Sequence, residues 1–564
     1  MIRFLTAGSA LMLAACGGST DDVQAGSENV EAADGAFATL YTGGTVYTGL
    51  DAPQTVESVL VGQNGRIISI GREEDIVSEF IGQIDRVDLG TGTMFPGFVD
   101  GHAHLIGIGQ RELTLDLSAT TSIEQLKEQI ASEVDKVSPG TVIYGRGWIE
   151  TGWPENRMPA ASDIDSVSRE NPVVLIRADG HALVANSAAI EAAGITDETP
   201  DPDGGSIERD DTAAATGIFV DNAMAPLRAL VSEPGDQERE AALALGAQVY
   251  ADRGWTGLHN MSVDPAEAPL MEKLDNQGRL PVRLHNAFNP DGMDLASARR
   301  HETDTIQNRS VKLYMDGALG SRGALLFEPY TDRPDTMGLA LRARNETLTA
   351  FETALENNVQ IAVHAIGDRA NFDAVTWMSD ALAGEPNADD TRWRVEHAQI
   401  IRPQDIPLFS EHGIIASMQP SHAIGDLKFA PDRLGQARLA GAYAWSSLLD
   451  AGALVVSGSD APVEVGSPVI EFYAATIRKA VDGTSGRGWH PEEAMSRMEA
   501  LHSFTLAPAY ASFQEDELGT IEPGKWADFS VFDKDLMTVS GPEMLETRAV
   551  MTVVAGEIVS TNSP

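Results

Sequence analysis

The sequence predicts an α/β protein built on a (β/α)8 barrel of the TIM type, with a smaller β-domain to which both ends of the chain contribute. Two patterns indicate this fold. In the middle of the chain, short apolar runs alternate with helical stretches, as expected for parallel βα units. At both ends, short strands separated by Gly and Asn-Gly turns replace that alternation.

The start of the chain carries a secretion pattern. Residues 1–15 combine a short basic start, an apolar run and small residues, which predicts a signal peptide. The run is too short to span a bilayer as a mature helix. Cys16 is the only cysteine of the chain and follows directly, in a segment that resembles a bacterial lipobox. We therefore expect lipidation at Cys16; a plain secretory signal with a chance cysteine is the alternative.

The segment after the cysteine, residues 16–37, is rich in Gly, Ser, Asp, Glu and Ala and is predicted to be a flexible tether. With lipid on Cys16, the protein would be extracytoplasmic and anchored to a bacterial membrane, in the periplasm or at the cell surface. No later segment carries a transmembrane run.

The β-domain is predicted from residues 38–94 and 517–564. Short strand patterns recur in both segments, separated by turn residues. The predicted strands are Leu40–Tyr41, Thr45–Tyr47, Ser58–Val61, Arg66–Ile70, Phe529–Phe532, Ala549–Val554 and Gly556–Val559.

The barrel is predicted from residues 95–516. Its eight candidate strands are Gly97–Asp100, Trp255–His259, Val282–His285, Val311–Met315, Gln360–His364, Arg394–His397, Ile414–Met418 and Leu454–Ser457. A long insertion at about 105–250 follows the first strand and contains strand patterns at 142–147 and 173–177. An insertion at this point would lie over the mouth of the barrel.

Composition limits the class of partner. The chain has 564 residues, of which 84 are acidic and 40 basic, so the formal net charge is -44. This balance argues against nucleic acid or an anionic membrane surface as a partner. We expect a small-molecule substrate, and membrane contact only through the lipid anchor. A single cysteine leaves no disulfide within the chain.

Polar residues at strand ends predict the chemistry. His102 and His104 are two residues apart at the end of the first strand, so both side chains point the same way. Further polar residues lie in or just after later apolar runs: Lys312, His364, His397 and Asp460. Each alone would be an ordinary core, rim or capping residue. Together, at strand ends that converge on one mouth, they predict a metal site of nitrogen and oxygen ligands, suited to Zn²⁺.

With these motifs the chain resembles the amidohydrolase superfamily, in its amidohydrolase-3 (YtcJ-like) branch. The resemblance runs from about Thr39 to the C-terminus. It implies a metal-dependent barrel with a composite β-sandwich formed by both termini. The matching segments are 96–104 (Pro-Gly-Phe-Val-Asp-Gly-His-Ala-His), 312–322, 363–371, 396–399 (Glu-His-Ala-Gln), 458–464 (Gly-Ser-Asp-Ala-Pro-Val-Glu) and 518–529.

The resemblance also implies roles for the six residues. His102 and His104 would bind the more buried metal, and His364 and His397 a second one. Lys312 would be carboxylated and bridge the two. Asp460 would contact the buried metal and the attacking hydroxide, and would transfer the proton to the leaving nitrogen. A site with one metal stays open.

Further matching segments imply a substrate pocket lined by Trp148, Asp179, His181 and Arg322. His181 is expected to contact substrate and to help stabilise the oxyanion. Core packing is the alternative for Trp148, and a structural ion pair is the alternative for Arg322. Asn260 stands where the branch usually has aspartate, at a position that we expect to be structural.

We therefore predict a metal-dependent hydrolase that cleaves non-peptide C–N bonds, amide or cyclic amide, of a small molecule through a metal-activated hydroxide. Hydrolysis of an aryl ester or lactone at the same site is the enzymatic alternative. A non-catalytic small-molecule-binding lipoprotein is the other, but it predicts a missing ligand. The sequence specifies neither the substrate nor the oligomeric state, and a homodimer is left open.

Overall fold

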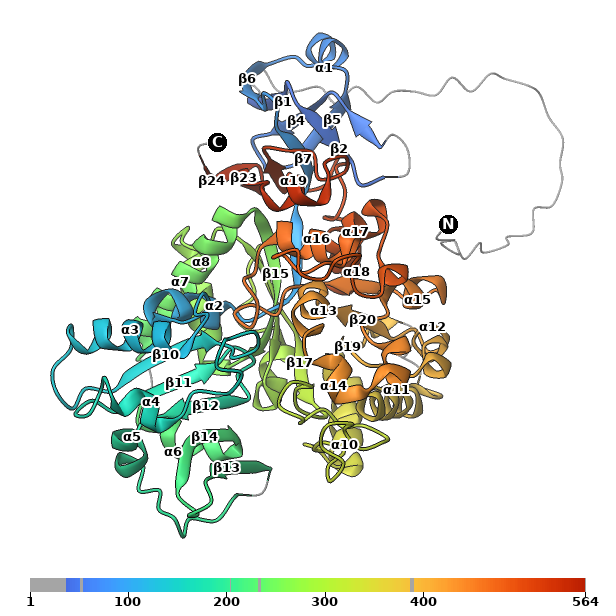
Figure 1. Ribbon diagram of the computed structural model, residues 1–564. Coiled ribbons are helices and arrows are strands. Elements are labelled where there is room, and N and C mark those ends of the chain that lie inside the picture. The colour runs from blue at the N-terminus through green and yellow to red at the C-terminus, as the bar shows by residue number, and fades with distance from the viewer. Residues whose placement is uncertain (1–36, 51–53, 203, 232–234, 386–389, 563–564) are drawn as a thin grey trace.

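The computed structural model describes residues 37–50, 54–202, 204–231, 235–385 and 390–562. The signal peptide and Cys16 lie outside the described residues, as does the tether apart from residue 37. The described strands form four sheets: an eight-stranded barrel sheet, a six-stranded sheet in the insertion, and two sheets from the ends of the chain. Figure 1 shows the terminal sheets above the barrel and the insertion beside it.

The barrel sheet confirms all eight predicted strands. Each strand is parallel to its neighbours, in the order β21-β20-β19-β18-β17-β16-β15-β8. Their apolar side chains are buried, and every residue of β16 and β18 is buried. The strands are β8 (Phe98–Ala103), β15 (Trp255–Val263), β16 (Arg283–Phe288), β17 (Ile306–Tyr314), β18 (Gln360–Ala365), β19 (Arg394–His397), β20 (Ile415–Met418) and β21 (Val455–Ser457).

Helices connect these strands and cover the barrel (Figure 1). Their buried faces pack against the strands in one large apolar core, except that α18 packs in a smaller cluster with residues of β20 and β21. They are α2 (Leu105–Leu113), α7 (Asp236–Arg253), α8 (Ala268–Asn276), α9 (Met293–Ala298), α10 (Arg344–Glu356), α11 (Asp368–Leu382), α12 (Pro407–Glu411), α13 (Pro420–Asp426), α14 (Ala430–Leu434), α15 (Trp445–Asp450), α16 (Pro468–Ile477), α17 (Arg497–Phe504) and α18 (Leu506–Ala511).

The first and last barrel strands are joined through the buried carboxylate of Asp100. This group accepts hydrogen bonds from the backbone nitrogen of Ser459 at 2.8 Å, from its hydroxyl at 2.5 Å, and from the Tyr250 hydroxyl at 2.9 Å. The backbone nitrogen of Asp460 donates to the carbonyl of His102 at 2.7 Å. A Cβ on Gly101 would lie 2.4 Å from Val456 Cγ1 and 2.6 Å from the Ser457 carbonyl oxygen, so this closeness requires glycine.

The insertion after β8 forms its own mixed sheet, in the order β13-β14-β12-β11-β10-β9. Two of its strands correspond to the predicted strand patterns, and two separate apolar cores cover its two faces. The strands are β9 (Leu115–Asp116), β10 (Ile143–Trp148), β11 (Val173–Arg177), β12 (Ala182–Ala185), β13 (Gly205–Arg209) and β14 (Ala215–Asp221); the helices are α3 (Ile123–Val134), α4 (Ala161–Asp165), α5 (Ser187–Ala192) and α6 (Ala225–Arg228).

Strands from both ends of the chain share the six-stranded sheet β24-β23-β22-β7-β2-β3, because β22 pairs with β7. Side chains of this sheet and of the four-stranded sheet β5-β4-β1-β6 meet in one apolar cluster. The elements are β1 (Phe37–Thr42), β2 (Thr45–Tyr47), β3 (Thr55–Val56), β4 (Ser58–Gly62), β5 (Ile67–Gly71), α1 (Glu73–Glu79), β6 (Gln83–Asp88), β7 (Thr93–Pro96), β22 (Phe529–Phe532), α19 (Gly541–Leu545), β23 (Ala549–Val554) and β24 (Glu557–Thr561).

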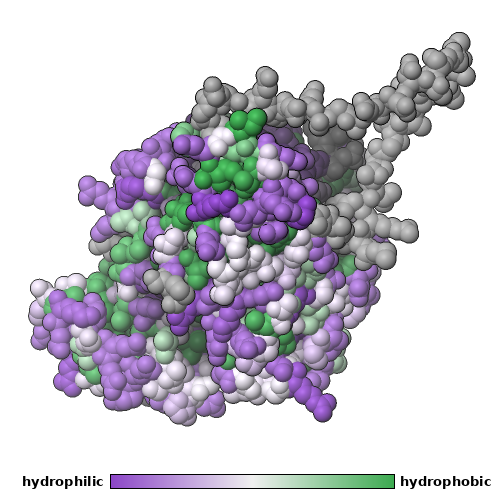
Figure 2. Space-filling view, turned by 90° about the horizontal axis from the view of Figure 1, so that it is seen from above, coloured by the Kyte–Doolittle hydropathy of each residue, from purple (hydrophilic) through white to green (hydrophobic). Residues whose placement is uncertain are grey.

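Figure 2 views this end of the molecule and shows hydrophobic residues gathered among hydrophilic ones. The exposed large apolar residues of the terminal sheets and α1 include Phe37, Ile68 and Ile558. Within the described part of the chain, none of the helices has the length and apolar character needed to cross a bilayer.

Gly101→Ala should lower the midpoint of thermal unfolding, because its Cβ would push β8 and β21 apart at a steric cost of about 1–3 kcal/mol. Differential scanning calorimetry measures this. Gly425→Ala is the matched control, since a Cβ there would meet only Glu464 Oε1, at 3.6 Å. Equal midpoints for Gly101→Ala and the wild type would contradict the role given to this glycine.

Candidate metal centre

The six predicted ligand residues lie at the carboxyl ends of the barrel strands. Lys312, His364 and His397 belong to β17, β18 and β19, while His102 belongs to β8. His104 is the residue before α2, and Asp460 follows β21. All are at least nine-tenths buried except His104, whose side chain is 27% exposed.

Their side chains meet in one cluster. One ligand atom from each of His102, His397 and Asp460 lies within 4.8 Å of the others. His104 Nε2 is 3.0 Å from Asp460 Oδ1, and Lys312 Nζ is 3.5 Å from His102 Nε2. The ring of His364 lies 4.5 Å from that of His397, centroid to centroid. The group of His102, His397 and Asp460 thus contains one residue from each of the two predicted metal subsites, together with Asp460.

Three of the histidines are held by the ring nitrogen that faces away from the cluster. The Nδ1 atoms of His104 and His397 donate to the Met261 carbonyl at 2.9 Å and to Gln419 Oε1 at 2.8 Å. His102 Nδ1 lies 2.5 Å from Glu396 Oε2. A proton fixed on Nδ1 leaves Nε2 with a free lone pair, which is the arrangement of metal-binding histidines.

The protonation states suit a cation. Burial and the neighbouring positive groups hold the pKa values of His364 and His397 well below the usual range, so both rings are neutral. For Asp460, burial raises the pKa, but its contacts with His102 and His104 outweigh this effect and hold it well below normal. Burial lowers the pKa of Lys312 to about 8.

The donor set therefore fits a divalent metal: imidazoles around a carboxylate, in a buried setting. His364 Nε2 supports this, because it is buried and has no hydrogen-bond partner among the described residues. Two of the residues also have left-handed backbone conformations, with φ of 71° at His397 and 61° at Asp460. Such conformations are unfavourable for residues other than glycine and cluster at functional sites.

Sequence reasoning missed the groups that support the ligands. Glu396 is fully buried between His102 and Arg394, whose Nε donates to Glu396 Oε1. Arg394 also donates to the Gly101 carbonyl and to Ser417 Oγ, both at 2.6 Å. In the sequence, the only signal for this role of Glu396 was its position in the Glu-His-Ala-Gln motif. Its partner His102 is 294 residues away in the chain, so no local pattern connects the two.

Asp316 and His422 were also not assigned to the site. Asp316 accepts hydrogen bonds from the backbone nitrogens of Leu325 and Gly367, both at 2.8 Å, and lies 3.5 Å from His364 Nε2. His422 Nε2 is buried, lacks a hydrogen-bond partner among the described residues and lies 3.6 Å from Asp460 Oδ2. His422 lies in the first turn of α13 instead of ending an apolar run, which is why the sequence pattern did not select it.

The insertion brings His181 and Asp179 to the site. His181 Nδ1 lies 2.8 Å from Asp221 Oδ1, and Asp179 accepts a hydrogen bond from the His181 backbone nitrogen at 3.1 Å. Burial lowers the pKa of His181, but the contact with Asp221 outweighs it and the net shift is upward. The charge of His181 acts on both Asp316 and His364, so this loop faces the barrel mouth.

The other two predicted pocket residues have different surroundings. Trp148 is fully buried in an apolar core of the insertion, where its indole donates to the Leu175 carbonyl at 2.9 Å. The structure therefore gives Trp148 a packing role in place of the expected substrate contact. Arg322 Nη2 lies 2.9 Å from Asp332 Oδ2, so Arg322 makes the ion pair that was the structural alternative for this residue.

Asn260 is buried and has a structural role, as expected. It accepts a hydrogen bond from the backbone nitrogen of Leu105 at 2.9 Å and donates to Asn286 Oδ1 at 2.9 Å. It thereby fixes the start of α2, directly after His104.

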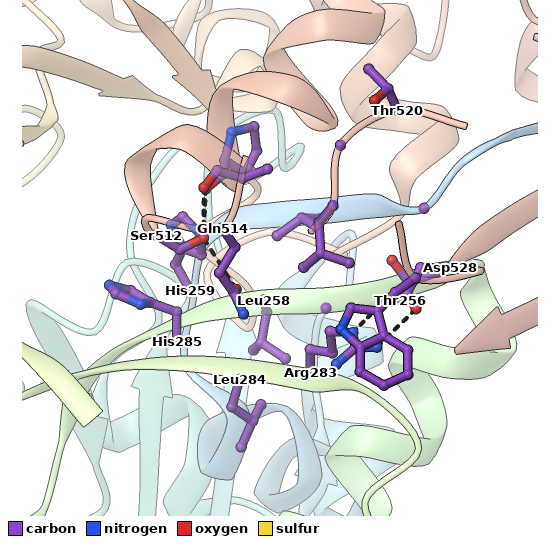
Figure 3. Close-up of a pocket in the computed structure, with 18 residues that line it drawn as sticks. Thr256, Leu258, His259, Arg283, Leu284, His285, Ser512, Gln514, Thr520 and Asp528 are labelled. Carbon is purple, nitrogen blue, oxygen red and sulfur yellow. Dashed lines mark hydrogen bonds and ion pairs between the residues drawn. The ribbon is translucent and has the colours of Figure 1, made fainter. Parts of the chain in front are cut away.

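A separate hollow lies at the opposite end of the barrel (Figure 3). It is lined by the early parts of β15 and β16, by α18 and by residues near β22. Its charged pair, Arg283 and Asp528, is joined by two hydrogen bonds of 2.6 and 3.1 Å. His285 bonds Ser310 at 2.9 Å and Gln360 at 3.0 Å. These satisfied groups stabilise the barrel base, while barrel enzymes keep their chemistry at the other end.

Comparisons with known proteins agree with this arrangement. The sequence profile of the amidohydrolase family matches residues 85–560. YtcJ of Bacillus subtilis (strain 168) is 31% identical over 531 residues, which cover 93% of this chain and 99% of that protein. An N-substituted formamide deformylase of Arthrobacter pascens is 27% identical over 537 residues, covering 90% and 95%. The crystal structure of an uncharacterized metal-dependent hydrolase from Pyrococcus horikoshii OT3 has a TM-score of 0.72 at 26% identity, covering 89% and 99%.

Glu396→Gln should weaken metal binding by about 10–100-fold, because the amide cannot hold His102 as the carboxylate does. Competition against a chromogenic chelator measures this affinity. Glu411→Gln, at an exposed carboxylate at the end of α12, is the matched control and should leave it unchanged. Unchanged affinity in Glu396→Gln would show that His102 needs no carboxylate partner.

Proposed function

The chain belongs to the amidohydrolase family, and on this basis we propose that it hydrolyses non-peptide C–N bonds, amide or cyclic amide, of a small molecule. The observation that carries the proposal is the cluster at the barrel mouth, in which His102 and His397 lie beside the Asp460 carboxylate and the nearby Nε2 of His364 has no hydrogen-bond partner among the described residues. One relative is named for deformylation of N-substituted formamides, a C–N cleavage of this type.

We propose that His102, His397 and Asp460 hold a divalent metal, with His104 and His364 available at the same site. Imidazole and carboxylate donors suit Zn²⁺. When bound, such an ion polarises a carbonyl and lowers the pKa of water, so that a nucleophile exists at neutral pH.

Asp460 would move the proton. It is ionised and buried, and its Oδ2 lies 3.6 Å from His422 Nε2. Because the carboxylate is ionised, it can accept a proton from water and then donate it to the leaving nitrogen. His181, held by Asp221, would donate a hydrogen bond to the carbonyl oxygen of the substrate as negative charge develops there.

Lys312 is suited to carboxylation. Its side chain is 1% exposed, and its amine lies beside His102 with no carboxylate in ion-pair distance among the described residues. Burial lowers the pKa of this amine to about 8, which raises the neutral fraction that can react with CO2. The resulting carbamate would supply two further oxygen ligands.

For the remainder of the chain we propose a lipid-anchored, extracytoplasmic protein, held by Cys16 through the tether. This rests on the sequence of residues 1–37. We also propose that the two terminal sheets form a composite β-sandwich domain, supported by their shared apolar cluster.

Inductively coupled plasma mass spectrometry of the purified protein should find one or two zinc equivalents per chain, and two equivalents that fall to one or none in Lys312→Ala would place Lys312 in a two-metal site. One equivalent that is unchanged by the substitution would place Lys312 outside a single-metal site. Lys127→Ala is the matched control, because Lys127 lies on α3 of the insertion, paired with Glu124. Absence of metal from wild type reconstituted with Zn²⁺ would contradict the metal-dependent mechanism.

Asp460→Asn should lower kcat for amide hydrolysis by about 10²–10⁴-fold, because an amide cannot transfer the proton. The assay uses a library of N-formyl, N-acyl and cyclic amides, with aryl esters and lactones alongside. Asp450→Asn, at an exposed position on α15, should leave kcat unchanged. Turnover of esters or lactones alone would identify the alternative reaction, and full amide turnover by Asp460→Asn would remove Asp460 from the mechanism.

A further inference from the structure

Arg146 on β10 is partly buried and carries a positive charge without a negative partner among the described residues. Its Nε is buried and has no hydrogen-bond partner among the described residues. Its Nη2 makes one long hydrogen bond, 3.4 Å, to the Ala178 carbonyl. Within the described part of the chain, no carboxylate lies within ion-pair distance of this guanidinium. Burial lowers the pKa of Arg146, and the more distant charges of Asp460 and Asp179 partly offset that effect.

Several arginines around the barrel mouth are paired with carboxylates, whereas Arg146 is not. Arg177 is paired with Glu150 and Asp179, Arg322 and Arg433 are paired with Asp332, and Arg394 is paired with Glu396. The fully buried Arg478 also has no carboxylate partner among the described residues, but it donates to the carbonyls of Trp489 and Tyr443, both at 2.9 Å. A partly desolvated charge without a partner is unfavourable, because the loss of hydration is not repaid. A negatively charged group of a ligand would supply the partner that Arg146 lacks.

The position of Arg146 identifies that ligand as the substrate. A Cβ built on Gly180 would lie 3.7 Å from Arg146 Nη2, so the guanidinium contacts the residue just before His181. Together with the bond to Ala178, this places Arg146 against the loop that carries His181 to the barrel mouth. Arg228 on α6 adds a second positive charge that acts on Arg146.

We propose that Arg146 binds a carboxylate of the substrate, which makes the substrate an amide with a carboxylate close to its scissile bond, as in an N-acylated amino acid. A guanidinium matches the planar carboxylate with two parallel hydrogen bonds. The local positive charge of Arg146 and Arg228 is needed because the chain as a whole has a net charge of -44 and repels anions. This inference rests on the proposed amide hydrolase and names its substrate class.

The experiment compares matched pairs of N-acetyl and N-benzoyl amino acids with their uncharged carboxamides. Calorimetric binding and kcat/KM are both measured on the full, zinc-loaded chain. The wild type should favour the carboxylate member by about tenfold or more, as expected for one charge-assisted pair. Arg146→Met should reduce this ratio to about one without weakening the carboxamide, and Arg146→Lys should retain part of it.

Arg157→Met is the matched control, because Arg157 is an insertion arginine paired with the Asp163 carboxylate, and it should keep the full ratio. Thermal melts of each variant check folding. Three outcomes would overturn the inference. The wild type could bind and hydrolyse both members of a pair equally, Arg146→Met could keep the carboxylate-to-carboxamide ratio of the wild type, or no carboxylate member could bind at all. Carboxylate-selective binding that Arg146→Met abolishes, without hydrolysis of any amide, would contradict the proposed hydrolase and support the carboxylate site.

Discussion

The closure of the barrel between β8 and β21 is the constraint on which the site depends. The proposed metal ligands lie on both sides of this seam: His102 at the end of the first strand and His104 just after it, and Asp460 after the last strand. The Asp100 carboxylate holds the two sides together, and Gly101 allows them to approach. Without this contact, Asp460 would not reach His104, and the cluster would lose its anionic member.

Burial explains why so many potential cations can occupy one cavity. Four histidines and a lysine within a few ångströms would repel one another if protonated. Desolvation shifts the rings of His364 and His397 to the neutral form, while Asp460 stays ionised. The cluster therefore combines imidazole nitrogens with the negative charge of Asp460. The Nδ1 contacts of His102, His104 and His397 orient the Nε2 atoms of these rings towards the centre of the cluster.

The sequence predicted the barrel strands and brought six ligand positions together, because both depend on local patterns: an apolar run and the polar residue at its end. It could not predict Glu396 against His102 or the role of His422, since these depend on which distant elements face each other. Trp148 shows the opposite error. Its motif placed it in a pocket, whereas the bulge after Arg146 in β10 and the packing of the insertion place its ring in a core. Residues 1–36 lie outside the described part of the chain, so lipidation at Cys16 stays a prediction.

The insertion has its own sheet and its own two apolar cores, separate from the core of the barrel. It nevertheless supplies His181 and Arg146, while the proposed metal-binding residues all belong to the barrel. With the functions proposed for these residues, reactivity and selectivity are encoded in parts of the gene that fold around different cores. Mutation can remodel one without disturbing the other, which gives this architecture a route to new substrates during evolution while the hydrolytic machinery is kept.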